Sequence, residues 1–106
     1  MNLTLVIFYY LLIRYAQDYV LDRCDVDLNT GCWNWRKSTD GRYGQAYIFG
    51  KKFKSHVVSA WAFGIKYKKH HITSHKCNNT KCCNPAHLEA VPQWENIKYC
   101  YSQGRR

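Results

Sequence analysis

Three metal-ligating side chains stand close together in the stretch SHKCNNTKCCNPAHL of this chain. Cys77, Cys82 and His87 follow the spacing C-x4-C-x4-H. Zn²⁺ prefers a tetrahedral set of thiolate and imidazole ligands, so three ligands on one loop leave a fourth position to be filled from elsewhere. The sequence therefore predicts a zinc site that fastens this loop to another part of the fold.

Cys32 is the predicted fourth ligand, because it would tie the early part of the chain to the late loop. Cys24, Cys83 and Cys100 stay open as alternatives, and Cys83 can take the place of its neighbour Cys82. Four protein ligands indicate a structural zinc, whereas three ligands and a water would indicate a catalytic one. Zinc binding worth about 10 kcal/mol or more suits a chain of 106 residues, whose core is modest.

The cellular compartment decides whether the six cysteines form disulfides or bind metal. The apolar start NLTLVIFYYLLI breaks at Arg14, well short of the roughly twenty residues that span a bilayer. It also lacks the basic start and small-residue cleavage site of a signal peptide. We expect an intracellular protein of the cytoplasm or nucleus, not secreted and not bound to a membrane, with reduced thiols. A secreted protein with three disulfides is the alternative.

The net charge of +9 lies wholly in the second half of the chain. Residues 1–50 carry five Lys/Arg and five Asp/Glu, whereas residues 51–106 carry eleven and two. A concentrated basic surface attracts polyanions through long-range potential and counterion release. Nucleic acid, and double-stranded DNA in particular, is the expected partner.

The pattern of apolar and turn residues predicts a single α+β domain without repeats or linkers. We expect helices over residues 3–22 and 55–63, the second ending at Gly64. CWNW and YGQAYIF are expected to pair as a hairpin. Residues 72–76 and 88–91 are expected to form strands, and a further helix follows Pro92 and ends at Gly104.

The stretch SHKCNNTKCCNPAHL, followed nine residues after His87 by Asn96, resembles the His-Cys box homing endonucleases and the zinc-bearing phage-type HNH nucleases. The shared spacing is H-x-C-x4-C-x4-H-x8-N, and GCWNW, RYGQAYIF and SHVVSAW resemble the remaining signatures, so the likeness covers residues 31–104. The apolar pattern predicts an N-terminal helix, residues 1–23, ahead of this region. The resemblance implies an HNH endonuclease domain at residues 24–106, a small ββα-metal (His-Me finger) fold with a β-hairpin, stapled by a structural zinc.

The resemblance also implies roles for single residues. His75 would be the general base that takes a proton from the attacking water, a task that suits a neutral imidazole. Asn96 would hold the catalytic Mg²⁺, and Asn84 would fix the loop and help to orient His75. Cys77, Cys82 and His87 would be structural zinc ligands, and the products would carry 5′ phosphate and 3′ hydroxyl groups.

Two positions depart from the family pattern. Ser74 stands where many HNH nucleases carry an acidic metal ligand, although the His-Cys box enzymes also lack that acid. Val57 follows His56 where phage-type relatives often place an arginine, which leaves the phosphate-binding cation open among several basic residues. The candidates for that cation are Arg36, Arg42, Lys51 and Lys52. Phosphate contacts are expected from the basic residues that flank the predicted strands, which are Arg42, Lys51, Lys52 and Lys54.

The sequence therefore predicts a Mg²⁺-dependent DNA endonuclease that carries a structural zinc. Whether it nicks one strand or cuts both stays open, as does a homodimer, which double-strand cleavage would need. The alternative is a catalytically silent, zinc-dependent module that binds nucleic acid.

Overall fold

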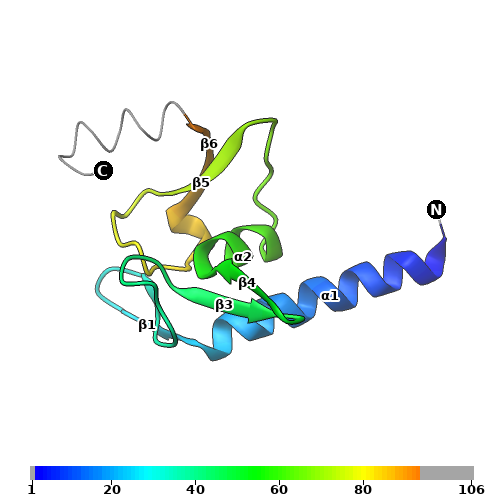
Figure 1. Ribbon diagram of the computed structural model, residues 1–106, viewed down its shortest axis with the longest axis horizontal. Helices are drawn as coiled ribbons and strands as arrows, with labels where there is room; N and C mark the ends of the chain where they lie inside the picture. The colour runs from blue at the N-terminus through cyan, green and yellow to red at the C-terminus, as the bar shows by residue number, and fades with distance from the viewer. Residues whose placement is uncertain (1, 94–106) are drawn as a thin grey trace.

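The computed structural model describes residues 2–93, and these fold into helices and three short antiparallel hairpins (Figure 1). In chain order the elements are α1 (Leu3–Asp22), β1 (Cys24–Val26), β2 (Trp33–Trp35), β3 (Gln45–Ile48), β4 (Lys51–Lys54), α2 (Ser55–Ala62), β5 (His71–His75), the 3₁₀ helix η1 (Pro85–His87) and β6 (Leu88–Pro92). Both helices and the last pair of strands are confirmed to within about one residue. The predicted helix after Pro92 lies outside the described residues.

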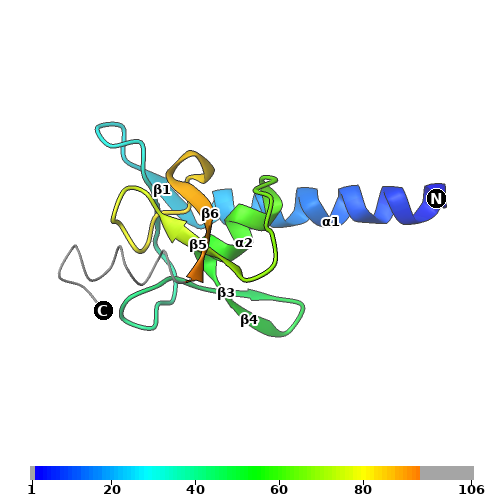
Figure 2. The same ribbon diagram turned by 90° about the horizontal axis from the view of Figure 1, so that it is seen from above.

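Helix α1 begins at a side-chain cap and is anchored only at its C-terminal half. The Oδ1 atom of Asn2 accepts a hydrogen bond from the backbone N–H of Thr4, which satisfies a donor that the first turn leaves open. Ala16 and Val20 are buried, and the side chain of Gln17 donates to the carbonyl of Ala62 in α2 at 2.9 Å. The N-terminal half projects from the body of the molecule in both views (Figures 1 and 2). None of the helices in residues 2–93 is long and apolar enough to cross a bilayer.

The predicted pairing of CWNW with YGQAYIF is wrong, because each of these strands pairs with a different neighbour. Strand β2 pairs with β1, and β3 pairs with β4. Phe49 and Gly50 have φ angles of 52° and 76° between the paired Ile48 and Lys51, as a two-residue turn between β3 and β4 requires. A second turn, in which the N–H of Gly31 donates to the carbonyl of Asp27, returns the chain from β1 to β2. Local turns therefore decide the pairing.

The apolar core lies between α1, α2 and the first two hairpins. Trp35 of β2 and Ala46 of β3 are buried there with Val58 of α2. Cys24 and Cys83 are also buried in this cluster. The third hairpin, β5 with β6, lies beside α2 (Figure 2). Residues 76–87, which connect its two strands, form the cysteine-rich loop. The core thus holds this loop through Cys83.

Gly44 precedes β3 at a point where the backbone comes close to the core. A Cβ atom there would lie 2.6 Å from Cδ1 of the buried Trp35 and would also collide with Oγ of Ser55. We expect Gly44→Ala to lower the free energy of unfolding by about 1–3 kcal/mol, because neither neighbour can move without disturbing the core. Thermal unfolding followed by circular dichroism measures this change. Gly41→Asn is the control, since Gly41 has open space and a positive φ that asparagine tolerates; equal stability of the two variants would contradict the prediction.

Candidate functional site

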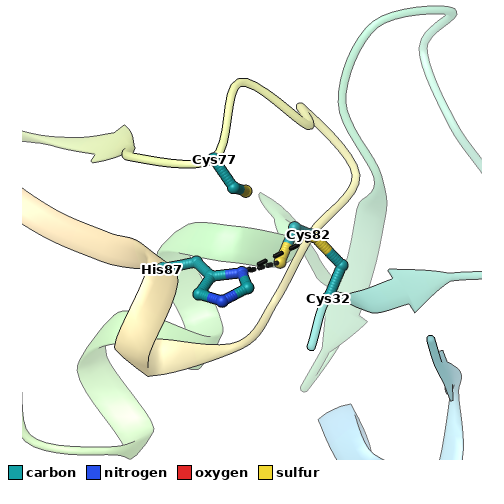
Figure 3. A group of neighbouring side chains, drawn as sticks. All are labelled: Cys32, Cys77, Cys82 and His87. Carbon is teal, nitrogen blue, oxygen red and sulfur yellow. Dashed lines mark hydrogen bonds between the residues drawn. The ribbon is translucent and has the colours of Figure 1, made fainter. Parts of the chain in front are cut away.

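Four side chains from three separate segments meet at the cysteine-rich loop (Figure 3). Cys32 comes from the turn before β2, Cys77 and Cys82 come from the loop after β5, and His87 ends η1. Their ligand atoms all lie within 4.8 Å of one another, and the side chains point toward a common centre. The structure therefore brings together the residues that the sequence proposed for zinc.

The distances within this cluster fit a tetrahedral zinc ion. Nδ1 of His87 lies 3.5 Å from Sγ of Cys32 and 3.5 Å from Sγ of Cys82. Bond lengths of about 2.3 Å to sulfur and about 2.0–2.1 Å to nitrogen give a tetrahedral edge of about 3.6 Å between S and N ligands. The cluster can thus bind zinc through Nδ1 of the histidine without rearrangement of these pairs.

The alternative ligands lie elsewhere. Cys24 and Cys83 are in the apolar core, where Sγ of Cys83 lies 3.8 Å from the carbonyl oxygen of Lys81. Cys100 lies outside the described residues. The structure therefore favours Cys82 over Cys83, and Cys32 over Cys24, as a member of the cluster.

The thiols of the cluster differ in their environment. Burial, together with the neighbouring Cys32 and Cys77, raises the pKa of Cys82 to about 12, although hydrogen bonds with the local backbone lower it. Burial also raises the pKa of Cys32, but hydrogen bonds with Thr30 and other neighbours outweigh it and bring the pKa to about 7. A zinc ion binds thiolates, so proton release accompanies loading of such a site.

Asn84 fastens the cysteine-rich loop to the turn that carries Cys32. Its Oδ1 atom accepts from the N–H of Ala86 and so caps η1, while its Nδ2 donates to the carbonyl of Gly31 at 2.6 Å. Gly31 has a φ of 77°, and an added Cβ would lie 3.5 Å from the His87 ring. The hydrogen bond from Nδ2 to Gly31 connects the cysteine-rich loop to the turn that carries Cys32.

His75 ends β5, and its side chain is buried to all but 9%. Its Nε2 atom lies 3.0 Å from the carbonyl oxygen of Cys82. A carbonyl oxygen can only accept, so Nε2 carries the proton, and in a neutral ring Nδ1 is then the basic nitrogen. Cys82 therefore contributes its sulfur to the metal cluster and its carbonyl to the orientation of His75.

Two aromatic rings that the sequence analysis did not assign to the site stack beside His75. The ring centroids of His56 and His75 are 4.4 Å apart, and Tyr43 stacks on His56 at 5.1 Å. Burial lowers the pKa of His56 to about 3, with smaller contributions from the charges of His75 and Lys54, so His56 is neutral. Both residues stand in stretches that resemble family signatures, His56 in SHVVSAW and Tyr43 in RYGQAYIF, but the resemblance gave neither of them a role at the site.

A pocket of about 400 Å³ opens next to these rings. Tyr43, His56 and Lys54 form one wall, and residues of β5 and the preceding loop form the other. Nζ of Lys54 lies 4.5 Å from the centroid of the Tyr43 ring, and the guanidinium of Arg42 lies 5.3 Å from it. None of the described residues that line this pocket is a carboxylate, so it presents a cation and polar rings around His56, which itself contacts the ring of His75.

The remaining candidates for DNA contact occupy different positions. Lys51 and Lys52 are exposed on β4, and Lys51 directly follows the turn. Arg36 holds the first hairpin together, because its guanidinium contacts Asp25 at 3.2 Å and the carbonyl of Cys24 at 2.9 Å. Arg36 is therefore a structural residue.

One residue, Asn96, is expected to hold magnesium. Asn96 lies outside the described residues. Ser74 lies on β5 directly opposite Glu89 of β6, the one carboxylate that residues 51–93 contain.

Comparisons with known proteins connect this arrangement to a fold. The chain is 21% identical to the solved homing endonuclease of the study "DNA binding and cleavage by the HNH homing endonuclease I-HmuI", with a TM-score of 0.54 over 76% of this chain and 49% of that one. The chain has an HNH fold. The predicted fold class, a small α+β domain with an N-terminal helix, hairpins and a Cys/His cluster suited to zinc, is confirmed for the described residues.

A phage protein shows a further likeness. The chain is 33% identical over 92 residues to Protein 2.8 of Escherichia phage T7, a match that covers 84% of this chain and 62% of that protein. No protein-family model matches the chain. This HNH chain thus spans less than two thirds of the length of either relative.

Proposed function

We propose that this protein is a metal-dependent DNA endonuclease in which His75 is the general base. The observation that carries the proposal is the position of His75 in an HNH fold, with Nε2 donating to the carbonyl of Cys82. This contact leaves Nδ1 as the nitrogen that can accept a proton in the neutral ring. The solved protein that shares this fold is a homing endonuclease that was studied for DNA binding and cleavage, which supports DNA as the substrate.

The proposed reaction is hydrolysis of a phosphodiester. Nδ1 of His75 takes a proton from a water molecule as its oxygen attacks phosphorus, and the bond from phosphorus to the 3′ oxygen breaks. The leaving 3′ oxygen takes up a proton from solvent and His75 returns its proton to solvent, so the products carry a 5′ phosphate and a 3′ hydroxyl. A Mg²⁺ ion, for which Asn96 is the proposed ligand, would supply charge stabilisation at the phosphate and the leaving oxygen.

In this proposal the zinc ion has a structural role. Cys32, Cys77, Cys82 and His87 fill all four positions of a tetrahedral site, which leaves none for a reacting water. Zinc would hold the loop whose Cys82 carbonyl contacts His75. The metal cluster thus acts on the reaction through the position of the base.

Lys54 is the proposed phosphate-binding cation. It lines the pocket beside His56 and lies over Tyr43, whereas Arg36 is engaged in the first hairpin. We expect Lys54→Met to weaken DNA binding and to reduce the slope of log affinity against log salt by about 0.9, the value of one phosphate contact. Fluorescence anisotropy with a labelled duplex at several salt concentrations measures both.

The control for this prediction is Arg14→Met, which removes the same charge from α1. Arg14 is exposed and pairs with Asp18 four residues later, away from the pocket. Its substitution is expected to leave the salt slope nearly unchanged. An equal change in slope for the two variants would show that Lys54 contributes only to the overall charge.

Incubation with supercoiled plasmid tests the function itself. We expect the wild-type protein to convert the plasmid to nicked or linear forms with Mg²⁺ and not with EDTA. Binding without cutting would instead support a silent, zinc-dependent module that binds nucleic acid. That second candidate is favoured by Ser74, which stands where a carboxylate would strengthen a magnesium site.

The five described cysteines are free thiols, which supports a reducing compartment and hence the interior of a cell. Alkylation of the denatured, unreduced protein checks this directly, because thiols react and disulfides do not.

A further inference from the structure

The N-terminal half of α1 exposes more apolar surface than a lone helix on a monomer should. Seven consecutive or nearly consecutive large side chains each expose more than half of their surface: Leu3, Leu5, Ile7, Phe8, Tyr9, Tyr10 and Leu11. At about 3.6 residues per turn these positions are distributed over every side of the helix. This segment of the helix extends beyond the body of the molecule (Figures 1 and 2). A helix that is apolar all round is normally buried.

An apolar pocket opens where this projecting segment meets the body. Its volume is about 550 Å³, and it lies between α1, the β3–β4 hairpin and α2. The apolar side chains that line it include Leu12, Ile48, Phe49, Phe53, Val58 and Trp61. Tyr15 of α1 stacks on Phe49 at 5.5 Å, so the pocket wall continues directly into the exposed stripe of Leu5, Phe8 and Leu12.

The charge distribution points to a second copy of this chain as the occupant. Residues 2–13 carry no charge, although the chain as a whole carries +9. Two copies that approach through α1 therefore avoid the repulsion that they would meet at their basic surfaces. A membrane surface fits less well, because helices that lie on lipid carry Lys or Arg on a polar face and the first charge of α1 is Arg14.

The spacing along the helix makes the surface self-complementary. A rise of about 1.5 Å per residue places Leu3 about 14 Å beyond Leu12, the α1 residue that lines the pocket. If two copies of α1 run antiparallel with their two-fold axis between residues 7 and 8, Leu3 of one copy lies level with Leu12 of the other. Each helix tip then reaches the mouth of the other copy's pocket, as an isologous interface requires.

We propose that two copies of this chain form a dimer through antiparallel packing of α1, with each helix tip at the apolar pocket of the other. The proposal is independent of the nuclease function. It does not involve the Cys/His cluster or His75.

Sedimentation equilibrium of the full chain tests the dimer with Phe8→Glu. Phe8 is 64% exposed and lies next to the proposed two-fold axis. In the variant, the glutamate carboxylates of the two copies would therefore lie close together and repel each other. We expect a dimer for the wild type and at least a hundredfold higher dissociation constant for Phe8→Glu. Leu28→Glu is the matched control, because Leu28 is 92% exposed in the turn after β1 and its change should leave the dimer intact.

A mixture of Phe8→Glu with Phe8→Lys tests the two-fold geometry. Each variant alone is expected to be monomeric, and the mixture is expected to restore a dimer because the opposite charges then meet. A monomeric wild type, a larger oligomer, or a dimer that survives Phe8→Glu would overturn the proposal. Binding of a monomeric wild type to phosphatidylcholine vesicles would assign α1 to a lipid surface instead.

Discussion

The Cys82→Ser variant is expected to be largely unfolded at room temperature, even with zinc present. Zinc at a site of this kind contributes about 10 kcal/mol or more in apparent free energy, whereas whole domains are stable by about 5–15 kcal/mol. Cys82 is a completely buried member of the cluster. In the serine variant, water from outside therefore cannot take the place of the missing sulfur ligand. Near-ultraviolet circular dichroism and the zinc content per chain measure the loss.

Cys83→Ala provides the control for this prediction. Cys83 is the adjacent residue and is equally buried, but it lies in the apolar core and outside the cluster. We expect this variant to keep one zinc per chain and to lose only about 1 kcal/mol of stability, the usual cost of a small truncation in a core. If Cys83→Ala lost its zinc and Cys82→Ser kept it, Cys83 would be the zinc ligand and Cys82 the core residue.

The second large effect is expected at His75. Its replacement by asparagine should lower the rate of Mg²⁺-dependent plasmid cleavage by about 10²–10⁴-fold, the typical contribution of a general base. Asparagine can still donate to the carbonyl of Cys82, but it has no basic nitrogen. Single-turnover cleavage, measured with the variant in excess over plasmid, separates this loss from weaker DNA binding.

The matched control is His70→Asn, which makes the same change at an exposed position before β5. His70 has a φ of 65°, a conformation that asparagine adopts readily. We expect His70→Asn to cleave DNA at nearly the wild-type rate. Neither His70→Asn nor His75→Asn is expected to change the affinity for DNA. If His75→Asn cleaves as fast as His70→Asn, His75 is not the base.

The metal cluster and the helices were predictable from the sequence because their signals are local. Cys77, Cys82 and His87 stand within eleven residues, and their spacing alone indicates a zinc loop. Helix α1 is long and contains no glycine or proline, so nothing in its sequence interrupts a helix. The choice of Cys32 as the fourth ligand required a further argument, because the residues around it give no reason to prefer it over Cys24.

The pairing of strands was not predictable in the same way. Strand β4, KKFK, is exposed at every position and therefore has no apolar alternation to reveal it. Strand β1 contains Asp25, a residue that strands disfavour, so the sequence does not indicate it as a strand. Both strands exist because tight turns bring them against a partner with a better pattern. His56 joins the site through the packing of α2 against β5, and Tyr43 joins it by stacking on His56. No local signal encodes either contact.

The distance along the chain between Cys32 and His87 has a consequence for synthesis of the protein. These two ligands are 55 residues apart. A ribosome adds about 5–20 residues per second, so Cys32 exists for several seconds before its last partner is made. During that time the nascent chain already exposes the apolar residues of α1 and has no means of completing the metal site. We expect it to depend on chaperones in this interval, and zinc can complete the fold only after the loop that ends at His87 has left the ribosome.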